Sequence, residues 1–368
     1  MVEEASGLRS GGYIVDFWGI GYDIADKMGL VPQIRELGYQ VEEVRFVDEA
    51  GHRSGGFSVD VLGKMTGGRF TSVRRSDISA VLYGALGDKI STIFGDSITK
   101  ISETGSRVKV DFHNSPTQEF DLVVGADGLH SKVRELVFGP DALFEKRLGY
   151  QVAAFEVAGY PYRDELVYVS HARPGKQISR FSMRGDKTLF LFVFRDELIG
   201  SNRPVTNTEK REVLRRVFAD VKWECPRILE CLDETTDLYF DSVSQVRMDR
   251  WSQGRVALIG DAAACVSLLA GEGTGLAIAE AFVLAGELKL AEGDLASAFT
   301  AYQQRLMPFL RSKQSSAAKF ASSFVPRSSF GIAFRDLITR LMGISFVAEY
   351  FVGRDLRDNI TLPEYQFN

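Results

Sequence analysis

The sequence predicts an α/β (α+β) fold in which two kinds of segment alternate along 368 residues. Two apolar runs, at 121–124 and 256–259, are each followed by glycine and an acidic residue, as strands often are in open α/β sheets. Between them, residues 146–250 contain successive short strand-like runs that are typical of an antiparallel sheet. A helical pattern follows from residue 295. We therefore expect two interleaved domains and a helical C-terminal region.

The first part of the chain alternates between strand and helix signals. Residues 13–17 predict a short strand, 107–112 a half-buried strand and 121–124 a buried strand. A helix is expected over 21–29, closed by its final glycine. A second helix begins at Arg75, with apolar residues on one face: Ile78, Val81, Leu82 and Leu86.

The middle of the chain has the pattern of a sheet interrupted by a helix. Strand-like runs cover residues 149–157, 166–170, 177–183, 188–194 and 239–250. Thr206 and Glu209 have the spacing of a capping box, which predicts a helix start. The helical face behind it consists of Val213, Leu214, Val217 and Phe218.

The last part returns to α/β character and then becomes helical. The strand expected at 256–259 is followed by glycines and a helix over 276–290. Beyond residue 295 one helical face carries Phe299, Tyr302, Leu306 and Leu310. A second amphipathic stretch, 330–351, favours a helix packed on the body of the protein, with a membrane-surface or partner helix as the alternative.

Composition and charge exclude several functional classes. A net charge of −5 and a pI of about 5.6 argue against a nucleic-acid partner. No apolar run approaches the length of a transmembrane segment. Three cysteines without a CxxC pair favour a reducing compartment, so we expect a cytoplasmic protein. The four histidines are far apart in sequence, and we expect no metal site.

The strongest chemical signal is Gly260-Asp261 at the end of the predicted strand 256–259. Glycine lets the backbone approach a ligand, and the carboxylate accepts hydrogen bonds from a sugar or ribityl hydroxyl. Ten residues later, Gly271-Glu272-Gly273-Thr274-Gly275 opens a helix. Unpaired N–H groups and the helix dipole at such a start favour an anion, either phosphate or the N1–C2=O edge of a reduced flavin.

A second signal, Gly125-Ala126-Asp127-Gly128, follows the predicted strand 121–124. Ser131 and Arg134 come one turn later. On its own this pattern is also compatible with a simple tight turn.

Together these motifs resemble the para-hydroxybenzoate hydroxylase-like (group A) flavoprotein monooxygenases over nearly the whole chain. The resemblance rests on Asp127-Gly128, on Gly260-Asp261 with its glycine-rich helix start, and on Arg75 in Arg-Ser-Asp-Ile. Arg9-Ser-Gly-Gly also resembles that family's loop toward the flavin. Two positions depart from the pattern, because Ala264 and Leu268 replace the histidine and proline found in many members.

The resemblance implies a Rossmann-like FAD-binding domain interleaved with an antiparallel-sheet substrate domain. The FAD-binding domain would comprise 1–44, 70–145 and 251–293, the substrate domain 45–69 and 146–250, and the C-terminal helical region 294–368. The implied cofactor-binding residues are Glu3, Arg9, Arg75, Asp127, Gly128, Gly260, Asp261, Gly271, Gly273, Thr274 and Gly275. No residue is assigned an acid–base or nucleophilic role, since the cofactor carries the chemistry.

The family opens with a strand, a Gly-x-Gly-x-x-Gly loop and a helix, which this sequence does not show. Gly19-Ile20-Gly21 is not that loop, because Ile24 takes the third glycine position. Met1-Val2-Glu3-Glu4 resembles the end of the next strand, where an acid binds the ribose. The glycine loop would then fall before Met1. We also expect Glu3 to lie on a frayed terminus.

The implied activity is hydroxylation of an aromatic or other electron-rich organic substrate, with NAD(P)H and O₂ as co-substrates, through a flavin C4a-hydroperoxide. Residues Phe181, Phe190, Phe192 and Phe194 either form plain core or line the substrate pocket. One alternative is an FAD-dependent reductase or dehydrogenase on the same fold. Another is a flavin-free ligand-binding protein or an inactive truncated fragment.

Overall fold

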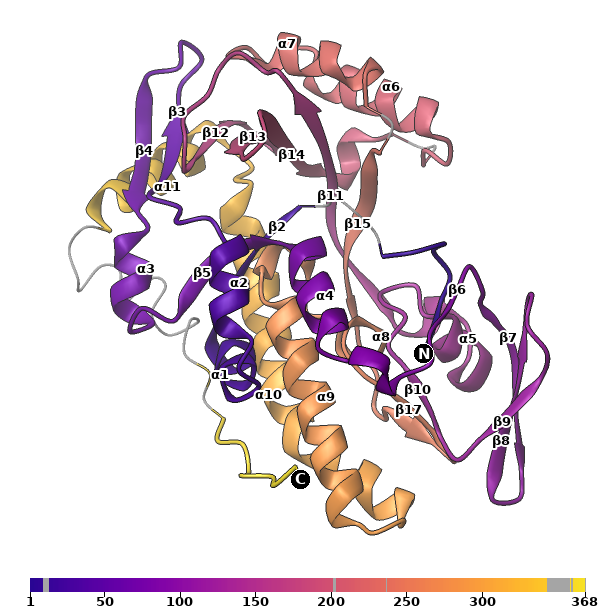
Figure 1. The fold of residues 1–368 in the computed structure, drawn as a ribbon. Helices are drawn as coiled ribbons and strands as arrows, with labels where there is room; N and C mark the ends of the chain where they lie inside the picture. The colour runs from indigo at the N-terminus through magenta and orange to yellow at the C-terminus, as the bar shows by residue number, and fades with distance from the viewer. Residues whose placement is uncertain (9–12, 201–202, 236, 343–357, 359, 368) are drawn as a thin grey trace.

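A computed structural model describes residues 1–8, 13–200, 203–235, 237–342, 358 and 360–367. It confirms the mixed α/β fold: one large sheet lies across one end of the molecule, and smaller sheets and long helices form the rest (Figure 1).

The large sheet has seven strands in the spatial order β15-β11-β14-β13-β12-β3-β4. In that order the strands are β15 (Tyr239–Val246), β11 (Glu145–Ala158), β14 (Lys187–Arg195), β13 (Lys176–Met183), β12 (Val167–Arg173), β3 (Glu43–Val47) and β4 (Arg53–Ser58). Neighbours are antiparallel except β12 and β3, which run parallel. The antiparallel sheet expected from the strand-like runs is therefore confirmed, with one parallel pair that the runs did not predict.

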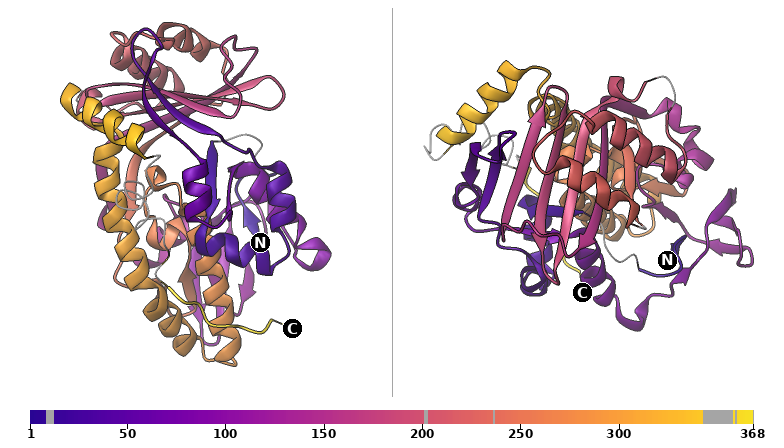
Figure 2. Two further views of the ribbon diagram at one scale, coloured as in Figure 1. Left: turned by 90° about the vertical axis from the view of Figure 1, so that its left-hand side faces the viewer. Right: turned by 90° about the horizontal axis from the view of Figure 1, so that it is seen from above.

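Two helices, α6 (Asn207–Phe218) and α7 (Cys225–Glu230), cover the outer face of this sheet (Figure 2). The capping box is confirmed, since Thr206 Oγ1 accepts the N–H of Glu209 and the Glu209 carboxylate accepts the N–H of Thr206. The helices bury one aromatic row of the sheet: Phe155, Phe190, Phe192 and Phe194. The space between these two helices and the sheet is therefore filled by a hydrophobic core.

The smaller sheets lie on the other side of the molecule. Two parallel pairs occur, β1 (Val2–Glu3) with β6 (Ile93–Phe94) and β10 (Val123–Gly125) with β17 (Val256–Leu258), and β16 (Ser252–Gln253) extends the second. Antiparallel sheets are formed by β2 (Ile14–Trp18) with β5 (Phe70–Arg74), and by β7 (Ile98–Thr104), β8 (Arg107–Phe112) and β9 (Gln118–Phe120).

The predicted burial of one strand, residues 121–124, was wrong. Residues 121–124 were expected to be buried, but Val124 is 38% exposed and Asp121 is also exposed. Within the described residues β10 pairs only with β17, so its other edge is open. An apolar run alone does not tell a central strand from an edge strand. By contrast, β17 is fully buried, as expected.

The remaining helices fall into two groups along the chain. Between β1 and β11 they are α1 (Gly19–Lys27), α2 (Val31–Leu37), α3 (Asp60–Met65), α4 (Arg75–Gly84) and α5 (Lys132–Phe138). After β15 come α8 (Asp261–Ala264), α9 (Gly273–Leu290), α10 (Leu295–Phe324) and α11 (Ser329–Leu341). Short 3₁₀ turns lie at Gly87–Lys89, Asp141–Leu143, Asp196–Leu198, Cys231–Asp233 and Leu268–Ala270. The largest core cluster joins β17, α8, α9 and α10.

The expected C-terminal helices are present as α10 and α11. The predicted face of α10 is confirmed as core, since Phe299, Tyr302, Leu306 and Leu310 are all buried. The described part of the second amphipathic stretch packs on β4, where Thr339 Oγ1 accepts the N–H of Gly56. Residues 343–351 of that stretch lie outside the described residues. In the part of the chain that the structure describes, no helix has the length and apolarity to cross a bilayer.

Candidate functional site

The strand β17 ends in a turn that only glycine adopts easily. Gly260 has φ 61° and ψ −143°, and positive φ is sterically costly for residues with a side chain. Asp261 then starts the short helix α8, and its side chain stays partly exposed. A buried strand thus delivers one accessible carboxylate to the carboxyl end of the sheet.

A buried pair of polar side chains supports this turn from beneath. The N–H of Gly260 donates a 2.9 Å hydrogen bond to Glu280 Oε2, and Glu280 is 1% exposed. The hydroxyl of Tyr302 lies 3.0 Å from the same oxygen and 3.1 Å from the carbonyl oxygen of Leu258. Burial raises the pKa of the Glu280 carboxyl to about 8, although both hydrogen bonds oppose this. Glu280 was not predicted from the sequence, where its only local signal is an acidic residue within a largely apolar helix.

The glycine-rich segment meets Asp261 directly. Gly271 has φ 69°, and Gly273 is the first residue of α9. A Cβ atom at Gly273 would lie 3.7 Å from Asp261 Oδ1 and would meet no closer neighbour. The first N–H groups of a helix have no partner within the helix, and the side chain of Glu272 does not cap them. The structure therefore places a carboxylate beside a helix start whose N–H groups no N-cap side chain of the described residues accepts.

The first turn of α9 also packs closely against α1. A Cβ at Gly21 would come within 2.2 Å of the Gly275 Cα, so the two backbones touch. The indole of Trp18 borders the segment just before this turn, since its Cη2 atom would be 3.9 Å from a Cβ at Gly271. Trp18 was not singled out from the sequence, because the contact joins residues more than 250 positions apart.

In the second motif, Gly125-Ala126-Asp127-Gly128, the carboxylate of Asp127 binds to the residues that follow it in the chain. Asp127 accepts hydrogen bonds from Ser131 Oγ at 2.5 Å and from the N–H of Val133 at 2.9 Å. Gly128 has φ 82°, in the left-handed region. Both carboxylate oxygens of Asp127 therefore hold the start of α5.

Arg134 joins the two motifs. This fully buried side chain donates to the carbonyl oxygen of Leu129 at 2.5 Å and to that of Ala262 at 2.9 Å. It also forms a 2.7 Å ion pair with Asp141. The loop after Gly128 and the helix after Gly260 are thus linked by one guanidinium group, and this arrangement keeps the two motifs in a fixed relation.

The large sheet reaches the site through Tyr239 on β15. Its ring lies 5.8 Å from that of Tyr13, whose carbonyl oxygen accepts the N–H of Arg75 at 3.2 Å. Burial raises the pKa of Tyr239, and the charges of Asp241, Arg75 and Asp261 act on it as well. In the described residues neither tyrosine hydroxyl has a hydrogen-bond partner. Arg75 therefore starts α4 beside Tyr13, whose ring contacts Tyr239 of the large sheet.

A histidine in the loop after Gly128 also bridges to the sheet. His130 Nε2 lies 3.2 Å from Asp241 Oδ2. This hydrogen bond raises the pKa of His130, against a smaller opposing effect of burial. The loop and β15 are therefore joined by an interaction that strengthens when His130 is protonated.

The two N-terminal candidates fall elsewhere. Glu3 lies in β1, which pairs with β6, so the expectation of a frayed terminus was wrong. Its Oε1 atom accepts the N–H of Ala5 at 2.9 Å, and no hydrogen bond or ion pair of the described residues joins it to Asp261. Arg9 lies outside the described residues.

The four phenylalanines do not form one pocket wall. Phe190, Phe192 and Phe194 point to the helices α6 and α7, because alternate residues of a strand share a face. Phe181 lies in another cluster, stacked on Tyr168 at 4.3 Å. The pocket-lining interpretation is therefore wrong for the three residues of β14. The opposite face of β14 carries Leu191, which is partly exposed beside Tyr239.

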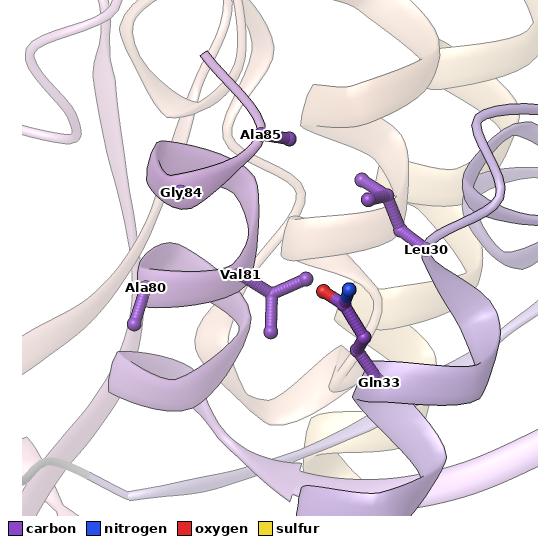
Figure 3. Close-up of a pocket in the computed structure, with 6 residues that line it drawn as sticks. All are labelled: Leu30, Gln33, Ala80, Val81, Gly84 and Ala85. Atoms are coloured by element: carbon purple, nitrogen blue, oxygen red, sulfur yellow. The ribbon is translucent and has the colours of Figure 1, made fainter. Parts of the chain in front are cut away.

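A separate pocket of about 480 Å³ opens between α2 and α4. Figure 3 shows its lining residues, Leu30, Gln33, Ala80, Val81, Gly84 and Ala85. None of them belongs to the site built around Asp261, and Gln33 supplies its one polar side chain. The pocket therefore adds no charged group to the candidate site.

The carboxylate of Asp261 and the backbone N–H groups at the start of α9 suit an organic cofactor with hydroxyl groups and an anionic edge. A carboxylate accepts hydroxyl hydrogens, and the start of α9 attracts negative charge. The open space over Gly273 admits close backbone approach. Among the described residues, no cluster of histidine, cysteine, aspartate or glutamate could hold a metal ion. These features fit the ribityl chain and pyrimidine edge of a flavin.

Comparison with known proteins gives a consistent assignment. Residues 22–306 match the family model described as FAD binding domain. A flavin-dependent monooxygenase of Legionella longbeachae is 30% identical over 100% of this chain and 92% of its own length. An uncharacterised protein of Mycobacterium tuberculosis is 37% identical over 85% of this chain and 84% of its own. The crystal structure of tetracycline destructase Tet(51) superimposes with a TM-score of 0.81, at 33% identity, and covers 99% of this chain and 92% of its own.

Proposed function

Since the chain belongs to the para-hydroxybenzoate hydroxylase-like family of FAD-dependent monooxygenases, we propose that it hydroxylates an aromatic or other electron-rich organic substrate with NAD(P)H and O₂. FAD is the cofactor, and the protein is an oxidoreductase. The observation that carries the proposal is the placement of Asp261 beside the first turn of α9, 3.7 Å from the Cβ position of Gly273.

The residues around that placement would hold FAD by complementary chemistry. Asp261 would accept hydrogen bonds from the ribityl hydroxyls, with Gly260 providing the turn. The backbone of Gly271, Gly273, Thr274 and Gly275 would face the pyrimidine edge of the flavin. Arg75 would lie against the flavin and ribityl face, close to Tyr13 and Tyr239.

The remaining candidates would act at the margins of the cofactor. Asp127 and Gly128 would support the FAD and nicotinamide sites indirectly, since the Asp127 carboxylate holds the start of α5. Glu3 is proposed for the ribose, and Arg9 for the loop toward the flavin. Their roles rest on the family resemblance.

Bound FAD would supply the redox chemistry, taking electrons from the nicotinamide and activating O₂. The protein would position the substrate and exclude water. Leu191 and Tyr239 on the inner face of the large sheet would contact the substrate, because they are partly exposed and Tyr239 lies near Arg75 and Asp261. The outer face is unsuitable, since α6 and α7 cover it.

Tetracyclines are the first compounds to test, because a tetracycline destructase shares 33% identity and the fold over nearly the whole chain. The departures lie between Asp261 and the glycine-rich segment, with Ala264 at the end of α8 and Leu268 at the start of the 3₁₀ turn before Gly271, and they would alter the shape of the substrate side. A panel of phenols and polycyclic enols should therefore accompany them.

The state of the cysteines supports the proposed cytoplasmic location. Cys225, Cys231 and Cys265 are all free, and burial raises the pKa of Cys225 to about 12. Such thiols are compatible with a reducing compartment, which supports a cytoplasmic location.

The experiment that tests the proposal combines flavin content with turnover. Purified protein is expected to carry FAD, seen in its visible absorbance, and to oxidise NADH or NADPH with O₂ uptake and a hydroxylated product. A reductase on the same fold would give NAD(P)H oxidation and a reduced product without stoichiometric O₂ uptake. That outcome would replace the proposed reaction with the alternative.

A further inference from the structure

A buried lysine lies close to the start of α9. Lys313, on α10, has a side chain that is 9% exposed. Its Nζ atom lies 2.9 Å from Glu272 Oε2 and 2.9 Å from Asp358 Oδ1. Figure 1 shows α9 and α10 running side by side with α1 next to α9, and these helices are in contact. Three segments distant in sequence therefore meet at one ammonium group.

Glu272 lies directly at the start of α9, where its charge acts on the potential of the helix N-terminus. It is the N-cap residue of α9, immediately before Gly273, and its side chain is 14% exposed. Its carboxylate does not cap the helix, and it pairs with Lys313. An unpaired carboxylate at this place would oppose the positive potential that a helix start offers to an anion.

Asp358 connects the same lysine to α1. Its Oδ2 atom accepts the N–H of Ile20 at 2.6 Å, at the start of that helix. One residue later, Gly21 touches Gly275 in the first turn of α9. Glu272 and Asp358, which both pair with Lys313, therefore belong to the surroundings of the glycine-rich turn.

The charge on Lys313 persists at neutral pH. Burial lowers the pKa of an ammonium group, but the charges of Glu272 and Asp358 outweigh it and leave the pKa of Lys313 above its ordinary value. A permanent positive charge thus offsets the nearby carboxylates.

We propose that Lys313 is a positioning residue that raises the reduction potential of the bound flavin by neutralising Glu272 beside the first turn of α9. The inference rests on the proposed function, in which this turn faces the flavin pyrimidine. Reduction places negative charge on that edge. A positive charge nearby favours the reduced flavin, and an uncompensated carboxylate disfavours it.

The test measures the midpoint potential of FAD bound to the full chain, by equilibration with reference dyes. Lys313→Met is expected to lower the ratio of reduced to oxidised flavin about tenfold at fixed potential, or about 30 mV for a two-electron couple. Glu272→Gln should shift the potential in the opposite direction, and Lys313→Arg should leave it close to the parent. The double variant Lys313→Met/Glu272→Gln should fall between the two single variants.

Lys222→Met is the matched control, because that side chain is 72% exposed and pairs with Glu49 on the surface. If Lys313 has a purely structural role, the midpoint potential should shift in the same direction in Lys313→Met and Glu272→Gln, or not shift at all. Either result would overturn the inference. If Lys313→Met fails to fold, Glu272→Gln decides alone, and an unchanged potential contradicts the proposal. Bound FAD with unchanged potentials would overturn only the role of Lys313, whereas a parent chain without FAD would overturn the proposed function as well.

Discussion

The backbone N–H of Gly260 donates a hydrogen bond to the buried carboxyl of Glu280, which lies one to two turns of α9 beyond Gly273–Gly275. The helix α9 therefore anchors the turn that carries Asp261, and in the proposed site its first turn would face the flavin. This geometry makes the Gly-Asp turn and the start of α9 a single unit. Substitutions on either part are expected to affect flavin binding in distinguishable ways.

Replacing Asp261 with Ala should weaken FAD binding by about 1–3 kcal/mol, because a ribityl hydroxyl loses its acceptor. The dissociation constant can be measured by fluorescence titration of the protein with FAD. Asp249→Ala is the matched control, since that carboxylate is fully exposed and pairs only with Arg311 among the described residues. Equal affinities in Asp261→Ala and the parent would remove Asp261 from the site.

Gly273→Val should lower flavin binding or slow its reduction while the chain stays folded. A Cβ there meets nothing closer than 3.7 Å, so the loss would come from blocked approach of the ligand. The contrasting variant is Gly21→Ala, whose Cβ would lie 2.2 Å from Gly275, and overpacking should cost about 1–3 kcal/mol of stability. Thermal melts and flavin content separate the two effects. A Gly273→Val protein with normal flavin content and reduction rate would show that this glycine serves packing alone.

Glu280 should make stability depend on pH in a defined direction. Its carboxyl has a pKa of about 8 in the folded chain, above the ordinary value of 4.5. Stability from such a group is fully present below the unfolded pKa and is lost as pH rises through the folded pKa. We expect the free energy of unfolding to fall between pH 4.5 and about 8, as measured by urea denaturation.

Glu280→Gln should remove this part of the pH dependence, because the amide oxygen can still accept the N–H of Gly260 without titrating. Glu280→Leu should destabilise the chain at every pH, since that N–H is then buried without a partner. Identical pH profiles for the parent and Glu280→Gln would show that Glu280 does not titrate in this range.

Tyr239→Ala should raise KM for the substrate roughly tenfold, about 1.4 kcal/mol, with FAD content unchanged. The reason is that Tyr239 is partly exposed on the sheet face toward Arg75 and Asp261. Phe190→Ala is the comparison on the other face. It should lower stability by about 3–5 kcal/mol through a core cavity while leaving KM unchanged. A raised KM in Phe190→Ala and an unchanged KM in Tyr239→Ala would place the substrate on the outer face of the sheet and contradict the proposal.

Local sequence signals predicted most of the elements that carry the site. The capping box at Thr206 and the strand–glycine–acid pattern before Asp261 depend on neighbouring residues, so they could be read directly. The direction of Phe190, Phe192 and Phe194 could not, because period-two alternation identifies a shared face but not which face meets the helices. The open edge of β10 depended on strand pairing, which a single apolar run does not specify.

The supporting residues were hidden for a different reason. Arg134, Glu280 and Lys313 act through contacts that span about 20 to 130 positions, and each alone has the pattern of an ordinary helical charge. Burial distinguishes them, since each is less than a tenth exposed and a buried charge needs partners. Only the folded chain shows that these partners lie around the Gly260-Asp261 turn and the start of α9.

The proposed reaction inserts oxygen from O₂ into an organic substrate at a flavin held by Asp261 and the start of α9. The most direct measurement is mass spectrometry of the product formed with NAD(P)H under ¹⁸O₂, starting with tetracyclines and the phenol panel. We expect a product whose mass increases by one ¹⁸O atom, and loss of this product in Asp261→Ala. A product that contains only ¹⁶O, or a reduced product formed without O₂, would contradict it.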